Sequence, residues 1–232
     1  NAQELFESHL EKVFSRSARG WEKRTLGELY KIGSSKRVHK KDWRETGVPF
    51  YRAREIVKLA QSGSVENDLF ITEDQFEEFS SKTGAPRPGD LMITAVGTLG
   101  ICYVVQPADR FYFKDASVLW FQPKSKINEW FMKYAFRSPV IREQTTDSQG
   151  ATVGTLTISR ANSISISIPN LEEQTKVANS LESLESQVRA LEVRLTTKRK
   201  LLHELKQSLL QKAFSGELTA DAAQREAEAA TA

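Results

Sequence analysis

The sequence of 232 residues has only one cysteine and three histidines, the residue types that form disulfides and most zinc sites. A single cysteine excludes an internal disulfide, and Cys102 lies in the apolar run LGICYVV, where we expect a buried, reduced thiol. The three histidines, His9, His39 and His203, are far apart, and no His/Cys set has the spacing of metal ligands. We therefore expect no metal site and no cofactor.

Long apolar runs and catalytic motifs are also missing. No stretch approaches the about 18 apolar residues of a membrane span, and the beginning does not resemble a signal peptide. With the single cysteine, this pattern is what we expect of a cytoplasmic protein. The sequence lacks an Asn- or Asp-Pro-Pro-aromatic motif for amino-methyl transfer, a G-x-x-x-x-G-K-S/T phosphate loop and an H-E-x-x-H zinc site. These absences favour a binding protein over an enzyme.

What the sequence does contain is a long heptad pattern over residues 169–216. Asn170 can serve as an N-cap with Glu173 three residues on, and Gly216 favours the end of a helix. Apolar residues recur at alternating steps of three and four, which is typical of a coiled-coil seam, with Lys198 as an interruption. A helix about 65 Å long is too long for one compact core, so we expect it to pair with another helix. The predicted seam residues are Val177, Leu181, Leu184, Val188, Leu191, Leu195, Leu202, Leu205 and Leu209.

A short segment near the beginning repeats the end of this helix. Residues 4–15, ELFESHLEKVFS, match residues 204–215, ELKQSLLQKAFS, at seven of twelve positions. The repeat predicts that the chain begins where an earlier long helix ends, and that the repeating unit is a globular domain followed by a helix. The partner of the long helix is then its counterpart, either in the same chain or on a second one. A chance match between two amphipathic helices is the alternative, which the shared Phe-Ser ending disfavours.

The net charge of +3 is distributed unevenly. Residues 16–58 contain 13 Lys and Arg against 5 Asp and Glu, a net charge of +8, so the rest of the chain is acidic. Such a concentration of positive charge is typical of a phosphate-binding surface, although a solvated basic surface without a ligand has the same composition.

Basic side chains within this segment are interleaved with Tyr51, Trp43 and His39, as backbone contact combined with base stacking on nucleic acid would require. Arg and Gln can form paired hydrogen bonds with guanine and adenine. The turn Gly97-Thr98-Leu99-Gly100 can present backbone amides to a phosphate, although a plain hairpin turn explains it equally well. The candidates for phosphate contact are Lys36, Arg37, Lys40, Lys41 and Arg44. The candidates for base-edge or groove contact are Arg52, Arg54, Thr98, Gln149 and Thr152.

Between its helical ends the sequence mixes strand and helix signals, which predicts an α+β (mixed α/β) domain followed by a long coiled-coil-forming helix. The aromatic face of residues 128–137, NEWFMKYAFR, is more typical of a core helix than of a ligand site. The expected strands are residues 30–32, 48–51, 91–96, 101–105, 118–122 and 163–168. The expected helices are residues 2–15, 72–79 and 128–137, and a polar loop is expected at 33–47.

Four segments together resemble one family: WEKRTLGEL, GVPFYRAREI, RPGDLMITAVGTLG, and ISISIPNLEEQTKVANSLESLESQV running into KQSLLQKAFSGELT. The chain resembles the specificity subunit of type I restriction-modification enzymes, or one repeat of it. The resemblance implies a non-catalytic subunit whose target-recognition domain reads half of a bipartite sequence in double-stranded DNA. It also implies a long helix that packs antiparallel on its counterpart as a spacer, and binding to DNA methyltransferase (modification) subunits and a motor-nuclease (restriction) subunit.

The resemblance divides the chain into four parts. Residues 1–19 are the end of a preceding helix, 20–168 the target-recognition domain, 169–216 the long helix, and 217–232 a frayed tail. A complete subunit has two domains and two helices, so we expect either the C-terminal half of a longer protein or a half-length subunit that dimerises.

Two other interpretations stay open. The chain could be the specificity domain of a single-chain type II enzyme that fuses methylation, cutting and recognition. It could also be a coiled-coil interaction protein that binds no nucleic acid.

Overall fold

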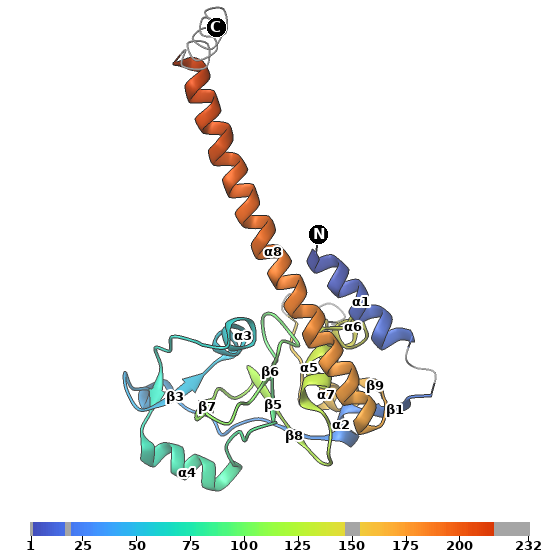
Figure 1. Ribbon diagram of the computed structural model, residues 1–232. Helices are drawn as coiled ribbons and strands as arrows, with labels where there is room; N and C mark the ends of the chain where they lie inside the picture. The colour runs from blue at the N-terminus through green and yellow to red at the C-terminus, as the bar shows by residue number, and fades with distance from the viewer. Residues whose placement is uncertain (1, 17–19, 147–153, 216–232) are drawn as a thin grey trace, which may run out of the picture. The chain divides into compact units, whose positions relative to one another are not determined.

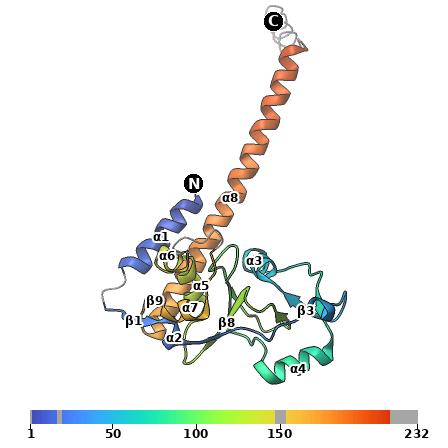
Figure 2. The same ribbon diagram turned by 180° about the vertical axis from the view of Figure 1, so that it is seen from behind.

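Three small β-sheets organise the globular part of the chain, which the computed structural model shows in Figure 1 and, from behind, in Figure 2. The structure describes residues 2–16, 20–146 and 154–215. They fall into two units, a compact one that spans Gln3–Ser183 and a second one that begins at Leu184.

The compact unit alternates short strands with short helices, and the long helix α8 begins within it. The strands are β1 (Glu22–Thr25), β2 (Tyr30–Gly33), β3 (Val48–Tyr51), β4 (Phe70–Ile71), β5 (Leu91–Thr94), β6 (Cys102–Val104), β7 (Tyr112–Phe113), β8 (Val118–Pro123) and β9 (Ser165–Ile168). The helices are α1 (Ala2–Arg16), α2 (Leu26–Leu29), the 3-10 helix η1 (Lys40–Asp42), α3 (Ala53–Ser62), α4 (Glu73–Thr83), α5 (Glu129–Arg137), α6 (Pro139–Thr146), α7 (Ile158–Ser163) and α8 (Leu171–Phe214).

The central sheet has the strand order β2-β8-β5-β6, and all its neighbouring strands are antiparallel. Helix α3 covers one face, where Ile56 and Leu59 pack with Met92. Helix α5 covers the other face, where the rings of Phe136 and Phe121 lie 5.7 Å apart. Because both faces are covered, β5 reads as the continuous apolar run LMIT rather than as an alternating pattern.

Two smaller sheets complete the unit. In the order β4-β3-β7, strand β3 pairs antiparallel with β4 and parallel with β7, and it buries Val48 and Phe50. In the third sheet β1 pairs antiparallel with β9, so that Glu22 lies opposite Ile168. The first and last strands of the domain therefore meet, immediately before α8 begins.

Helix α1 packs on the domain as an integral part of the compact unit, against α5 and α6 (Figures 1 and 2). Its residues Phe6, Leu10 and Phe14 are buried, whereas Leu5 on another face is 74% exposed. The ring of Phe6 lies edge-on to Tyr134 at 6.3 Å, and Phe14 lies 5.3 Å from Phe131. Aromatic pairs of this geometry add to the free energy gained from burial alone.

The first turns of α8 are fixed to the domain. The predicted N-cap is confirmed, since the backbone N–H of Glu173 donates to Oδ1 of Asn170 at 2.9 Å. Gln174 is buried, and its Oε1 accepts from the backbone N–H of Asn128 at 2.9 Å. Ala178 and Leu181 are buried as well.

Among the helices in the described ranges, none is long and apolar enough to cross a membrane.

Most elements predicted from apolar runs and aromatic faces are confirmed. Strands β2, β3, β5, β6 and β8 and helices α1, α4 and α5 lie where the sequence placed them, within a few residues. As expected of a core helix, α5 buries Phe131, Tyr134 and Phe136. The long helix ends at Phe214, and the predicted C-cap at Gly216 and the tail at 217–232 lie outside the described residues.

Some elements were missed or misplaced, and each case has a physical reason. The strand expected at 163–168 begins only at Ser165, because Thr157 caps the unpredicted α7 by accepting from the backbone N–H of Arg160 at 3.2 Å. Strands β4 and β7 have two residues each, too few for a period to be recognised. Helix α3 was missed although Gly63, with a φ of 74°, marks its end.

The single cysteine gives a first test of the fold. Cys102 is buried in β6, and its burial raises the pKa of the thiol to about 12. Because only the thiolate reacts, we expect the native protein to react with an aromatic disulfide reagent about a thousandfold more slowly than the unfolded protein at about pH 8. Absorbance at equal reagent concentration, with and without denaturant, measures this ratio. Equal rates would contradict the placement of Cys102 in the core.

Candidate nucleic-acid interface

The basic loop between β2 and β3 is fixed by its backbone and its apolar residues. Val38 is buried, and the ring of Trp43 lies 6.4 Å from that of Phe50. Arg44 and Phe70 of β4 exchange two backbone hydrogen bonds, of 2.9 and 3.0 Å. These contacts hold the loop in place without using the side chains of Lys40 or Lys41.

The positive charges on this loop differ in how far they are already paired. Lys40 and Lys41 are exposed on η1, and within the described part of the chain their ammonium groups have no ion pair. The side chain of Arg37 is 75% exposed, and its Nε lies 3.8 Å from the carboxylate of Asp115. Arg44 donates to the carbonyl oxygens of Lys41 and Trp43, at 3.0 and 2.9 Å, which directs its guanidinium along η1.

Lys36 is the exception among the phosphate candidates. Its ammonium group lies 3.3 Å from the carboxylate of Glu78 and 4.9 Å from the ring centre of Phe79. Its backbone N–H donates to the hydroxyl of Tyr112 at 3.0 Å. Lys36 thus links the loop to α4. Because its charge is already paired with Glu78, it is less available to a ligand than the charge of Lys40 or Lys41.

A second basic cluster lies where β3 meets α3. Glu55 is 1% exposed and accepts from Nε of Arg52 at 3.1 Å, from Nη2 of Arg52 at 3.0 Å, and from Arg54. The carboxylate of Asp68 accepts from Arg52 at 2.8 Å and from Arg54 at 2.6 Å. The side chain of Arg54 is 55% exposed, against 24% for Arg52. The guanidinium of Arg54 is therefore accessible to a ligand, whereas the guanidinium of Arg52 is mostly buried in ion pairs with Glu55 and Asp68.

The pKa values of both carboxyls reflect this arrangement. Burial by itself raises the pKa of Glu55, but the hydrogen bonds from Arg52 and Arg54 lower it overall. The hydrogen bond from Arg54 lowers the pKa of Asp68. Both carboxylates are therefore ionised at neutral pH, and they hold the two guanidinium groups in a fixed relation.

Glu55 should make stability depend on pH in a defined direction. Its pKa is lower in the folded protein than in the unfolded chain, so its contribution is present above about pH 4.3 and is lost as the pH falls further. We expect Glu55→Gln to destabilise the protein by about 2 kcal/mol at about pH 6, and by less at about pH 3. Urea unfolding at the two pH values, with the exposed Glu66→Gln as the matched control, measures the difference. An equal destabilisation at both would contradict this role.

The turn between β5 and β6 is rigid and presents Thr98 to solvent. Gly97 and Gly100 have φ values of 77° and 76°, which favour glycine, and the hydroxyl of Thr94 accepts from the backbone N–H of Ile101 at 3.0 Å. The same hydroxyl donates to the carbonyl oxygen of Thr98. Val96, beside this turn, pairs with Thr155 in an isolated bridge. The predicted contact residues Gln149 and Thr152 lie outside the described residues.

The structure brings the two basic clusters to the same small sheet but does not bring all candidates to one point. Phe70 of β4 pairs with Arg44 on one side and with Pro49 of β3 on the other, and Arg52 directly follows β3. Sequence reasoning missed the acidic partners. Glu55 accepts from the backbone N–H of Arg52 at 2.9 Å, as in a capping box, but the N-cap is an arginine rather than Ser or Thr, so the usual sequence signal is absent. Over the described residues, no group of three or more His, Cys, Asp or Glu could hold a metal ion.

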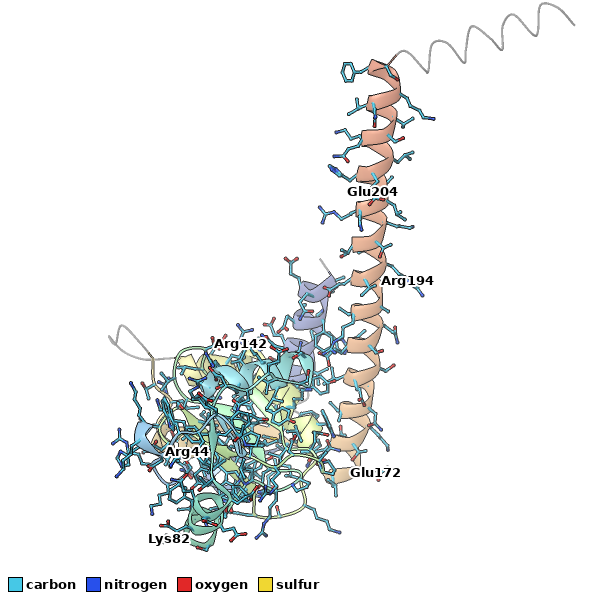
Figure 3. All side chains as sticks on the ribbon, turned by 90° about the vertical axis from the view of Figure 1, so that its left-hand side faces the viewer. Arg44, Lys82, Arg142, Glu172, Arg194 and Glu204 are labelled. Atoms are coloured by element: carbon cyan, nitrogen blue, oxygen red, sulfur yellow. The ribbon has the colours of Figure 1, made fainter. Side chains whose placement is uncertain are left out.

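The seam of α8 is open over most of its length. Leu191, Leu195, Leu202, Leu205 and Leu209 are 48% to 65% exposed, in the part of the helix that Arg194 and Glu204 mark in Figure 3. Leu181, by contrast, is buried within the compact unit of this chain.

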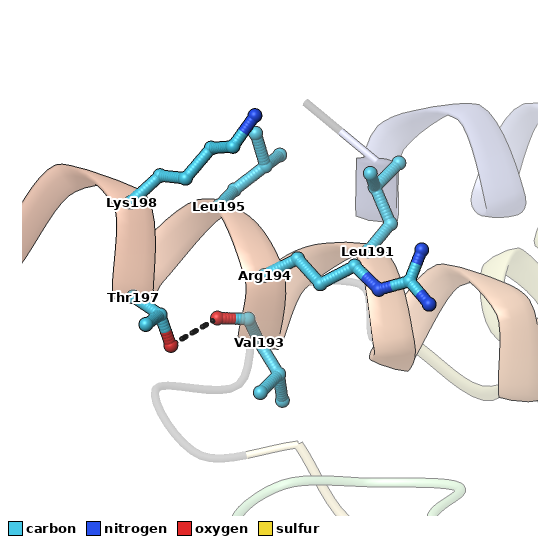
Figure 4. Close-up of a pocket in the computed structure, with 6 residues that line it drawn as sticks. All are labelled: Leu191, Val193, Arg194, Leu195, Thr197 and Lys198. Atoms are coloured by element: carbon cyan, nitrogen blue, oxygen red, sulfur yellow. Dashed lines mark hydrogen bonds between the residues drawn. The ribbon is translucent and has the colours of Figure 1, made fainter.

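Lys198 interrupts the seam without breaking the helix. Figure 4 shows its side chain running alongside Leu195 on the face that also carries Leu191, so the aliphatic stem continues the apolar stripe. Val193 points to another side, and its carbonyl oxygen accepts from the hydroxyl of Thr197 at 2.9 Å.

The structure thus has a mixed α/β domain with an exposed basic loop, and a long helix with an exposed stripe of leucines. Residues 18–198 match the model of the type I restriction modification DNA specificity domain, and the chain belongs to this family. Its members are specificity components rather than enzymes, as the sequence led us to expect.

Individual relatives agree with this family. The chain is 27% identical over 162 residues to a Haemophilus influenzae protein described as the putative type I restriction enzyme specificity subunit S.HindORF215P. The match covers 69% of this chain and 39% of that protein. The HsdS subunit from Thermoanaerobacter tengcongensis matches with a TM-score of 0.65 at 20% identity, over 93% of this chain and 51% of the other.

Two further structures show the same fold. A chain from a study of complex assembly in a type I R-M system matches with a TM-score of 0.70 at 20% identity, over 92% of this chain and 51% of the other. The S subunit from M. genitalium matches with a TM-score of 0.56 at 17% identity, over 84% and 50%. The chain thus spans about half the length of these solved relatives.

Proposed function

We propose that the chain recognises one half of a bipartite DNA target for a type I restriction-modification system. The observation that carries this proposal is the basic loop: Lys40 and Lys41 are exposed and have no ion pair with any residue that the structure describes, while backbone contacts hold the loop in place. A fixed surface with uncompensated positive charge gains free energy by releasing the counterions of DNA. Membership of the DNA specificity family supports the same function.

The contacts divide into two classes by their accessibility. Lys40, Lys41 and Arg37 neutralise phosphates, with Arg44 and Lys36 in support. Base edges are read by Arg54, Thr98, Gln149 and Thr152, and Arg52 positions Arg54 through Glu55 and Asp68. Breaking the pair between Arg54 and Asp68 requires little free energy, because both side chains are more than half exposed. Arg54 can therefore exchange a carboxylate for guanine.

The long helix has a spacing role in this proposal. Its open seam pairs with the counterpart helix of a second copy or of another half, and the pair holds two recognition domains apart. A helix of about 65 Å is close to two DNA turns of about 35 Å each, which places two domains on the same side of the duplex. The assembly works in the cytoplasm with DNA methyltransferase subunits and a motor-nuclease subunit, for which the specificity component is the scaffold.

DNA binding by the full chain tests the proposal directly. We expect a fluorescein-labelled duplex with random sequence to bind with an affinity that falls steeply as salt rises, because counterions are released. Fluorescence anisotropy at several salt concentrations measures the slope. Binding that is absent at low salt, or independent of salt, would contradict the proposal and favour a protein-only interaction role for the chain.

A further inference from the structure

An exposed carboxylate lies beside the two basic clusters. The side chain of Asp68 is 62% exposed, and Asp68 lies two residues before Phe70, which pairs with Arg44 of the basic loop. A negative charge at this place repels phosphates and so weakens binding to any duplex. In return, a carboxylate supplies what lysine and arginine lack, which is an acceptor for the amino group of a base.

The backbone on both sides of Asp68 is fixed. Val65 packs against the core between α3 and the central sheet, and Leu69 packs against the core cluster that contains Phe50. The carbonyl oxygen of Leu69 accepts from the backbone N–H of Phe50 at 2.9 Å and from the side-chain amide of Asn67. The exposed carboxylate therefore stands on a segment that the core holds in place.

Two guanidinium groups orient the carboxylate itself. Oδ1 of Asp68 accepts from Nη2 of Arg52 at 2.8 Å and from Nη2 of Arg54 at 2.6 Å. Arg52 is held in turn by the buried Glu55, so it keeps Asp68 in place when Arg54 turns to a ligand. Among the described residues, no other residue donates to Oδ2 of Asp68, and this oxygen is available to an amino group.

The order of these groups matches the major-groove edge of a G·C base pair. That edge presents two acceptors of guanine, N7 and O6, followed by the N4 amino group of cytosine. Arg54 supplies donors for the two acceptors, and Asp68 supplies an acceptor 2.6 Å from Nη2 of Arg54. Guanine O6 and cytosine N4 are themselves hydrogen-bonded, about 2.9 Å apart. The spacing of the two side-chain groups therefore fits the spacing of the two base groups.

We propose that Asp68 is a specificity-determining residue, which accepts a hydrogen bond from the N4 amino group of cytosine while Arg54 binds the guanine of the same base pair. On sequences without this pair, the carboxylate gains no hydrogen bond and only repels phosphates, so it disfavours binding to other duplexes. The inference rests on the proposed function and on the role of Arg54 at a base edge.

Replacing Asp68 by alanine should change affinity and selectivity in opposite directions. The natural full-length chain is first used to select from a duplex library with a random core, and the enriched duplex is compared with the library by fluorescence anisotropy. We expect Asp68→Ala to bind the library about fivefold more tightly, but to prefer the enriched duplex over the library about tenfold less than the natural chain does. A residue with a merely structural role would lower both affinities.

Glu66→Ala is the matched control, because Glu66 is exposed, lies two residues away and carries the same charge. It should change either affinity by less than about twofold. Circular dichroism verifies the fold of both variants.

A modified base identifies the contact itself. In the enriched duplex, pyrimidin-2-one replaces the cytosine opposite the guanine at which Arg54→Ala loses its preference. This base lacks only the N4 amino group. We expect the replacement to weaken binding by the natural chain about tenfold, and binding by Asp68→Ala by less than about twofold.

Equal losses of both proteins on the modified duplex would overturn the inference, as would equal effects of Asp68→Ala and Glu66→Ala. A selection that enriches no G·C pair dependent on Arg54 would overturn it too. In each of these cases, salt-dependent binding of the library by the natural chain would still support the proposed function. The absence of such binding would overturn the proposed function as well.

Discussion

Replacing Leu195 and Leu202 by lysine should abolish the pairing of α8 with a second helix. Both side chains are exposed in the single chain, at 48% and 65%, so the change should not unfold the protein. In a paired seam each leucine would be buried, and burying one leucine contributes about 2 kcal/mol. A lysine at each position removes this gain and adds repulsion beside Lys198. We expect the self-association constant to fall at least about a hundredfold, as measured by sedimentation velocity.

The matched control places lysines on the side of the same helix that faces away from the predicted seam. Val193 is 67% exposed and Ala190 is exposed as well, and neither belongs to the seam or flanks it. Val193→Lys with Ala190→Lys should leave association unchanged within about twofold. If both double variants sediment as the wild type does, the seam is not an interface. If both are equally impaired, association is caused by general apolar exposure rather than by a heptad interface.

Replacing Lys40 and Lys41 by alanine should weaken DNA binding on every sequence alike. Each lost phosphate contact should reduce the slope of log affinity against log salt by about 0.9, because fewer counterions are released. Two lost contacts should reduce the affinity by about one to two orders of magnitude at low salt. The η1 helix is held by its backbone and by Trp43, so the fold should be unaffected.

A control with the same change in net charge separates a local contact from general attraction. Lys12 and Lys126 are exposed and lie outside the basic segment. Their double replacement by alanine should leave the salt slope unchanged. An unchanged slope in the Lys40 and Lys41 variant would remove these residues from the interface, and an equal reduction in both variants would show that only net charge matters.

The sequence predicted those parts of the fold whose signal is local and strong. Strand β5 lies in a continuous apolar run and helix α5 has an aromatic face, and the Asn170 cap of α8 is a short motif with a direct physical basis. The pairing of β3 with β7 could not be predicted, because it joins Phe50 to Tyr112 across the chain, and β7 has only two residues. Non-local pairing of such short segments leaves no period in the sequence.

The sequence indicated which candidate residues are basic and exposed, but not how they are paired in the folded protein. Charge concentration identified Lys40 and Lys41, which the structure exposes on a fixed loop. It could not show that Arg54 is more exposed than Arg52, because the exposure of each side chain depends on the buried Glu55 and on Asp68, which is distant in sequence. Whether an arginine is available to a ligand depends on its folded neighbours.

The central claim, that this chain reads one half of a bipartite DNA target, is tested most directly by the methylated sequences in cells. Methylation should be mapped genome-wide in cells that produce the natural chain and in cells that produce Arg54→Ala. We expect a bipartite motif with an unspecified spacer, in which Arg54→Ala alters the specificity of one half and leaves the other unchanged. An uninterrupted motif, or a motif that is unaffected when this chain is deleted, would contradict the account.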